Sequence, residues 1–202
     1  MAKLPTKPFK VGPATLNWVW LNGQGSLNEM GDTPRYEYKA TAVLPKEDAQ
    51  PFIDQLNQFW LEYNGGDEKK AAKVKSLGYK EDEDGNITFT FKTNTSFVQK
   101  DGSEKPAVVR VFRGNGQEIT DSFHAAEKKA ANGSEGIVHG VMAIYDRNAA
   151  ARGVTLYLSA VQFVKFLEYS GSVDVSAVTE EDDGLGGDGL DVTPVTQDAP
   201  NI

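Results

Sequence analysis

Few side chains in this 202-residue chain have the chemistry that catalysis or metal binding requires. There is no cysteine, which excludes disulfides, thiolate zinc sites and cysteine nucleophiles together. The two histidines, His124 and His139, are too few for a histidine metal site. Residues 184–189 match the letters of a dinucleotide-binding motif, but they follow no strand, open no helix and lie among carboxylates. We therefore expect no metal ion, no cofactor and no catalytic activity.

Aromatic side chains alternate with basic ones along several segments, and this pattern indicates a different chemistry. Single-stranded nucleic acid is held with little sequence preference by bases that stack on aromatic rings and by phosphates that contact Lys or Arg. Each stacked base is worth about 1–3 kcal/mol, and each phosphate contact adds affinity that salt weakens. The candidate contact residues are Trp18, Trp20, Tyr36, Tyr38, Lys39, Lys92, Arg110, Phe112, Tyr145, Arg147, Arg152 and Tyr157.

The tryptophans and tyrosines among these candidates also have an alternative role in the hydrophobic core. Trp18 and Trp20 alternate with smaller apolar residues, so either face of their segment can be the buried one. Large aromatic residues fill cores more often than they serve as stacking platforms. Tyr36 and Tyr38 are better candidates for nucleic-acid contact, because basic residues flank them on both sides.

The neighbours of the remaining candidates predict which way they point. Arg110 and Phe112 alternate with two valines, so inward-facing valines would turn Arg110 and Phe112 outward together. Tyr157 lies between two leucines that are expected to be buried, which places it outside. Phe89 and Phe91 are more typical of core residues.

The C-terminal segment accounts for the whole net charge of the chain. Removing its eight acidic residues from the total of 29 leaves 21, which balance the 21 Lys and Arg. A Gly-rich segment with few large apolar residues is expected to be disordered. It is either an internal competitor for a polyanion-binding site or a solubilising tail. The acidic residues are Asp174, Glu180, Glu181, Asp182, Asp183, Asp188, Asp191 and Asp198.

Hydrophobic periodicity predicts the elements that position the candidates. Residues 1–13 contain three prolines and are expected to form an irregular arm. Residues 15–21 and 34–44 alternate at period two and predict strands, as do four later segments ending near residue 167. Residues 45–63 have the i, i+3 and i+4 apolar spacing of an amphipathic helix. About six or seven strands without a strand–helix–strand rhythm favour an antiparallel barrel or sandwich with the helix inserted between strands.

The order of these segments is similar to that of a known family. The motifs PRYEYKATAVLPKED, QFW, DGNITFTFK, VVRVFRGNGQEI, GIVHGVMAIYD and GVTLYLSAVQFVKF, over residues 33–183, resemble the single-stranded DNA-binding proteins of tailed bacteriophages. The resemblance implies an OB-fold barrel with a helix between strands and an acidic C-terminal tail. It implies DNA binding through Tyr36, Tyr38, Lys92, Arg110 and residues 145–152. Residues 180–183 match the start of a tail that competes with DNA and recruits replication proteins, although this tail ends without the family's aromatic residue.

Together these observations predict an OB-fold single-stranded DNA-binding domain over residues 1–173 and a disordered acidic tail over residues 174–202. We expect single-stranded DNA as the partner, phage or host replication proteins as further partners, and no membrane, because no apolar run reaches roughly 20 residues. The absence of a signal-peptide pattern predicts a cytoplasmic location in the infected cell. The alternative function is a β-rich phage structural or interaction module. RNA binding and self-association stay open.

Overall fold

The computed structural model describes residues 4–29, 34–148 and 150–169. The chain divides into a compact unit that ends at Glu168 and a second unit that begins at Tyr169. The predicted acidic tail, with Glu180, Glu181, Asp182, Asp183, Asp188 and Asp191, lies outside the described residues. The boundary predicted at residue 173 falls there as well.

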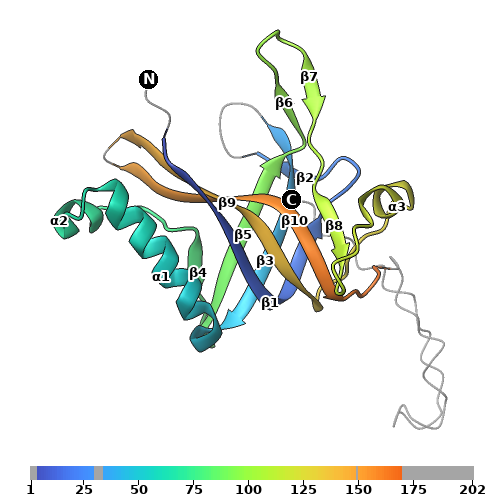
Figure 1. Ribbon diagram of the computed structural model, residues 1–202, viewed down its shortest axis with the longest axis horizontal. Coiled ribbons are helices and arrows are strands. Elements are labelled where there is room, and N and C mark those ends of the chain that lie inside the picture. The colour runs from blue at the N-terminus through green and yellow to red at the C-terminus, as the bar shows by residue number, and fades with distance from the viewer. Residues whose placement is uncertain (1–3, 30–33, 149, 170–202) are drawn as a thin grey trace, which may run out of the picture. The chain divides into compact units, whose positions relative to one another are not determined.

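Strands dominate the described chain, as the alternating segments predict (Figure 1). In chain order the elements are β1 (Thr6–Trp20), β2 (Ser26–Asn28), β3 (Arg35–Pro45), α1 (Lys46–Tyr63), α2 (Glu68–Ala71), β4 (Tyr79–Glu81), β5 (Asn86–Asn94), β6 (Ser96–Val98), β7 (Glu104–Pro106), β8 (Arg110–Arg113), α3 (Thr120–Ala125), β9 (Ser134–Asn148) and β10 (Ala151–Lys165). The predicted helix over residues 45–63 is confirmed as α1. The short strands β2, β4, β6 and β7 were not predicted, because three residues are too few to show a period.

Five strands close into a barrel. The order β3–β1–β9–β10–β5 returns to β3 through an additional β3–β5 pairing. Most of these pairings are antiparallel, whereas β10 runs parallel to β5 and to β8. A five-stranded closed sheet with α1 inserted between β3 and β5 is OB-fold-like, as predicted. None of the helices formed by the described residues is long and apolar enough to cross a membrane.

Aromatic residues from three elements, β1, α1 and β5, fill the end of the barrel that α1 covers. The ring centroid of Phe52 on α1 lies 5.1 Å from that of Phe9 and 5.0 Å from that of Phe89. The Phe9 ring also lies 5.3 Å from the ring of Phe91. Gly140 on β9 allows this packing, since a Cβ there would lie 2.6 Å from the Phe9 ring. Burial of these side chains therefore holds the helix against the sheet.

The predicted irregular arm over residues 1–13 is wrong for residues 6–13, which are part of β1. This part of β1 pairs antiparallel with β9, beginning with Thr6 opposite Ala143. The register shifts between Val11 and Ala14, so Pro13 lies at an irregularity where the missing N–H interrupts no regular ladder. Phe9 and Val11 are buried. The prolines in this segment made its apolar alternation hard to recognise in the sequence. Pairing with the long strand β9 holds the segment extended despite them.

Candidate nucleic-acid interface

Four of the predicted contact residues form one row across four neighbouring strands. Trp20 on β1 lies opposite Lys39 on β3, and Lys39 lies opposite Lys92 on β5. Lys92 lies opposite Tyr157 on β10 through the parallel pairing that closes the barrel. Since adjacent strands are about 4.8 Å apart, the row spans about 14 Å of the barrel surface. We call these four residues the outer row.

The outer row points away from the core because its sequence neighbours point inward. Val19 and Leu21 on either side of Trp20 are buried, as are the leucines on either side of Tyr157. Tyr157 is 46% exposed, and Trp20 and Lys39 are half-buried. The row therefore presents an aromatic ring at each end and two ammonium groups between them.

A buried carboxylate lies beside the outer row. Glu37 Oε2 lies 3.4 Å from Lys92 Nζ, and its Oε1 accepts a hydrogen bond from Arg35 Nε at 3.0 Å. Burial raises the pKa of Glu37, but the hydrogen bond from Asn28 and the charges of Lys92 and Arg35 outweigh it and hold that pKa below its usual value. Glu37 therefore stays ionised and holds the Lys92 ammonium in place. Among the described residues Lys39 makes no ion pair, which leaves it available to a phosphate.

Arg110 and Phe112 on β8 face outward together, because Val109 and Val111 are fully buried, as predicted. The Arg110 guanidinium lies 4.9 Å from the centroid of the Phe112 ring. Its Nε and Nη2 donate to the two Glu118 oxygens at 3.0 and 2.6 Å. These hydrogen bonds, with a further one from Thr120, lower the pKa of Glu118 to about 2. Arg110 is thus already paired with a carboxylate, and a phosphate has to compete with Glu118 for it.

Tyr38 is poorly placed for the predicted DNA contact. Tyr38 is only 9% exposed and belongs to the core, and its hydroxyl donates to the Gly23 carbonyl oxygen at 3.3 Å. Tyr36, two residues earlier on the same face of β3, lies beyond the buried layer and is exposed. The alternation was predicted correctly, but the depth to which the barrel buries that face depends on strands far away in sequence.

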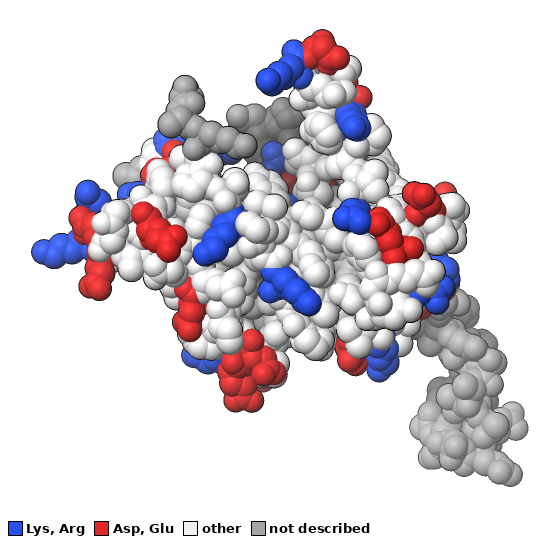
Figure 2. Space-filling model, viewed as in Figure 1, with Lys and Arg blue, Asp and Glu red and all other residues white. Residues whose placement is uncertain are grey.

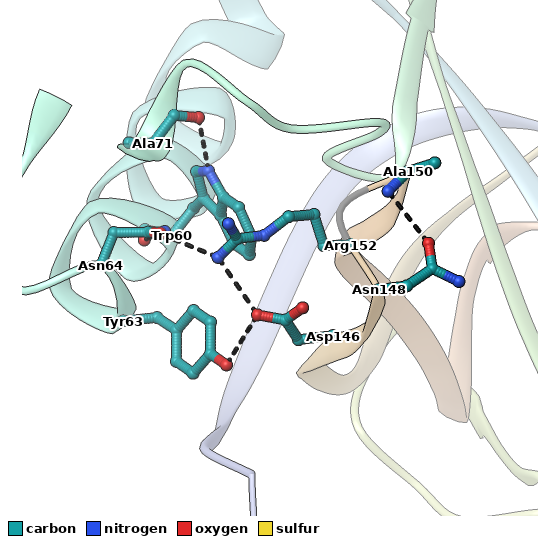
Figure 3. Close-up of polar contacts among 8 residues, drawn as sticks. All are labelled: Trp60, Tyr63, Asn64, Ala71, Asp146, Asn148, Ala150 and Arg152. Atoms are coloured by element: carbon teal, nitrogen blue, oxygen red, sulfur yellow. Dashed lines mark hydrogen bonds and ion pairs between the residues drawn. The ribbon is translucent and has the colours of Figure 1, made fainter. Parts of the chain in front are cut away.

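Contacts within the protein occupy the guanidinium of Arg152, another predicted contact residue (Figure 3). Arg152 Nη2 lies 3.1 Å from Asp146 Oδ2 and donates to Asn64 Oδ1 at 3.0 Å. The guanidinium carbon lies 5.1 Å from the centroid of the Trp60 ring, and the side chain is 18% exposed. Tyr63 donates to the same Asp146 oxygen at 3.0 Å. These residues, the Arg152 corner, join the β9–β10 hairpin to the end of α1.

The other two candidates on this hairpin differ in exposure. Tyr145 is half-buried, and its burial raises the pKa of its hydroxyl. Arg147 is exposed near the end of β9, and no ion pair of Arg147 is found within the described chain. Arg147 is therefore free to contact a phosphate, whereas Tyr145 offers only part of its ring.

Two outward-facing sets of residues were missed by sequence reasoning. Lys10 on β1 is exposed opposite His139 on β9, and it was missed because residues 1–13 were expected to be irregular. Burial, together with the nearby Lys10 charge, lowers the pKa of His139. Phe97 on β6 is 51% exposed and pairs with Lys105 on β7. Each pair again combines a ring with a basic side chain.

Charges are unevenly distributed over the surface. Figure 2 shows a face whose middle carries isolated Lys or Arg side chains among uncharged ones, while most acidic side chains lie nearer the margin. No cluster of three or more His, Asp or Glu side chains suited to a metal ion occurs among the residues with defined positions. The basic side chains in the middle of this face thus suit an anionic ligand.

Comparisons with known proteins agree with this architecture. No protein-family model and no curated protein sequence matches the chain. Among solved structures, gp2.5, a single-stranded DNA-binding protein encoded by bacteriophage T7, aligns with a TM-score of 0.64 and 22% identity over 87% of this chain and 97% of that chain. The single-stranded DNA-binding protein of bacteriophage Enc34, in complex with single-stranded DNA, aligns with a TM-score of 0.52 and 16% identity, over 81% of this chain and 89% of that one. The chain therefore has the fold of phage single-stranded DNA-binding proteins.

Proposed function

We propose that the protein binds single-stranded DNA across the outer row, without catalysing a reaction on it. The observation that supports this function best is the register of the row, in which Lys39 and Lys92 lie between Trp20 and Tyr157. A DNA strand laid across the barrel stacks bases on the two rings and brings phosphates to the two ammonium groups. Stacking and phosphate contacts do not depend on the identity of the base, so we expect little sequence preference.

The biological role follows from the same chemistry. A protein that covers single strands protects them during phage replication and recombination in the infected cell. The formal charge of −8 lies entirely in the C-terminal acidic segment, so that segment is an intramolecular rival of DNA or a docking site for replication proteins. The names of the phage proteins with this fold support single-stranded DNA as the ligand.

A titration of full-length protein with oligo-dT, followed by tryptophan fluorescence at two salt concentrations, tests the proposal. We expect quenching, and an affinity that falls as salt rises. The variant Lys39→Ala/Lys92→Ala should bind at least tenfold more weakly, with a shallower salt dependence. The matched control is Lys69→Ala/Lys73→Ala, which removes the same charge from exposed positions in and after α2. Equal losses in both double variants would contradict a localised site.

The alternative function, a phage structural or interaction module, is favoured by one observation. The β6–β7 hairpin projects from the barrel (Figure 1), and Phe97 and Val98 are exposed on it. Exposed apolar side chains on a projecting ribbon suit contact with another protein. This function predicts no binding to oligo-dT in any variant. A parallel titration with oligo-rU separates DNA from RNA binding, because the 2′-hydroxyl is the group that differs along the backbone.

A further inference from the structure

Strand β1 contains a bulge at Trp18. Asn17 lies opposite Thr41 and Trp20 lies opposite Lys39, so β1 advances three residues while β3 advances two. Trp18 has φ of 52°, in the left-handed region that bulky residues rarely adopt. A glycine would adopt this conformation without steric cost, and glycine is the usual residue at such a bulge. The backbone alone therefore does not explain a tryptophan here.

The bulge reverses the side-chain alternation of β1. In a regular strand, Leu16, Trp18 and Trp20 share one face. Leu16 is fully buried, so a regular strand would direct both tryptophans into the core. With one extra residue inserted, Val19 and Leu21 are buried instead, and Trp18 is 48% exposed. The bulge is thus the reason that both indoles lie on the outer surface.

A loop from the other half of the chain holds the bulge in place. The Trp18 N–H donates to Asn132 Oδ1 at 2.8 Å. In return, the Gly133 N–H donates to Asn17 Oδ1 and to the Leu16 carbonyl oxygen, both at 3.1 Å. The loop and the bulge therefore satisfy each other's backbone groups, which stabilises a conformation that Trp18 would otherwise avoid.

We propose that Asn132 is a positioning residue for DNA binding, which acts by fixing Trp18 as an outward-facing stacking platform beside the outer row. This inference rests on the proposed function and extends it to a residue that touches no DNA itself. An indole whose backbone is already fixed loses less conformational freedom when a base stacks on it. Asn17 assists by fixing the loop that carries Asn132.

A double-mutant cycle in DNA affinity tests this proposal. Trp18→Gly removes the indole while glycine tolerates the positive φ of the bulge. We expect Trp18→Gly to weaken oligo-dT binding roughly tenfold, the size of one lost stack. Asn132→Ala should weaken binding about threefold when Trp18 is present and should have no further effect in the Trp18→Gly background, because a positioning residue acts only through the indole. Asn115→Ala is the matched control, since Asn115 Oδ1 also accepts a backbone N–H, from Gln117 at 3.0 Å.

The outcomes separate this inference from the proposed function. Losses that multiply in the double variant, or an Asn132→Ala variant that binds like wild type, would overturn the positioning role. If the Trp18 and Asn132 variants bind oligo-dT with wild-type affinity while Lys39→Ala/Lys92→Ala binds weakly, the positioning role of Asn132 fails. The proposed DNA binding across the outer row is then still supported. If the wild-type protein does not bind oligo-dT, both the proposed function and the positioning role of Asn132 are overturned. Should Asn132→Ala fail to fold, Asn17→Ala replaces it, because it removes the reciprocal hydrogen bond to Gly133 and is expected to show the same coupling to Trp18.

Discussion

The outer row and the Arg152 corner both place a tryptophan beside a basic side chain, but they use the pair in opposite ways. At the corner, Trp60 is buried, and Asp146 and Asn64 hold the Arg152 guanidinium over its ring. In the outer row, Trp20 is half-exposed opposite Lys39, which makes no ion pair within the described chain. The residue types are therefore a poor guide to function. What separates the Trp20–Lys39 pair from the Trp60–Arg152 pair is whether the protein itself already supplies the cation with an ion-pair partner.

Arg110 lies between these two cases. It is exposed and lies over the Phe112 ring, yet its Nε and Nη2 both donate to Glu118. Ion pairs at the surface contribute little to stability, so Glu118 can be displaced by a phosphate at low cost. Arg110 can thus contact a phosphate only by displacing Glu118, whereas Lys39 has no such competitor in the part of the chain that the structure describes.

The largest effect is expected from removing both rings of the outer row. Trp20→Ala/Tyr157→Ala should weaken oligo-dT binding by about 2–6 kcal/mol, because each stacked base contributes about 1–3 kcal/mol. Equilibrium fluorescence anisotropy with labelled oligo-dT measures this loss. Tyr157→Phe keeps the ring and should bind like wild type. A loss in Tyr157→Phe as large as in Tyr157→Ala would show that the hydroxyl matters rather than stacking.

The Arg152 corner should respond in stability and not in binding. Arg152→Ala leaves Asp146 without its cationic partner and removes packing on Trp60, so we expect the free energy of unfolding to fall by about 2 kcal/mol in urea titrations. The affinity of the folded variant for oligo-dT should change less than twofold. Arg147→Ala is the control for stability, since Arg147 is exposed on the same hairpin. A tenfold loss of DNA affinity in Arg152→Ala would erase the distinction between the two regions.

Removal of the acidic segment tests whether the cations of the outer row are the ones that DNA and the segment compete for. Truncation after Val178 is expected to tighten oligo-dT binding severalfold at low salt, because the removed carboxylates compete with phosphates for the same cations. Titrations at low and high salt measure the effect, which should disappear when the Debye length falls to about 3 Å at 1 M salt. In Lys39→Ala/Lys92→Ala the truncation should have a much smaller effect. Unchanged affinity after truncation would contradict competition with DNA and would favour the solubilising role of the acidic segment.

The smallest effect is expected at Glu118. Its pKa is lowered from 4.5 to about 2 in the folded protein, first by the hydrogen bond from Arg110 and then by that from Thr120. A lowered folded-state pKa means that the ion pair stabilises the protein above pH 4.5 and loses this contribution as the pH falls toward 2. Thermal unfolding of wild type and Glu118→Gln should therefore differ slightly at neutral pH and converge in acid. At neutral pH, Glu118→Gln should bind oligo-dT about twofold more tightly, because Arg110 is released.

Much of the architecture was predictable because it depends on neighbouring residues. The alternation of residues 34–44 predicted β3, and the apolar spacing of residues 45–63 predicted α1. The outward orientation of Arg110 and Phe112 followed from the valines beside them. Residues 6–13 were misassigned because proline is a local signal against strands, while pairing with β9 is a distant one.

The sequence by itself determined most of the long elements and the chemistry they carry: a β-rich body of balanced charge with aromatic and basic side chains, an acidic C-terminal segment and no cysteine. Only the tertiary structure decided which of these side chains meet. Register brings Trp20, Lys39, Lys92 and Tyr157 into one row, and a hydrogen bond from Trp18 to Asn132, 114 residues away, keeps an indole outside. The physical reason is that periodicity is a property of adjacent residues, whereas strand register, bulges and the partners of a cation depend on segments that meet only when the barrel closes.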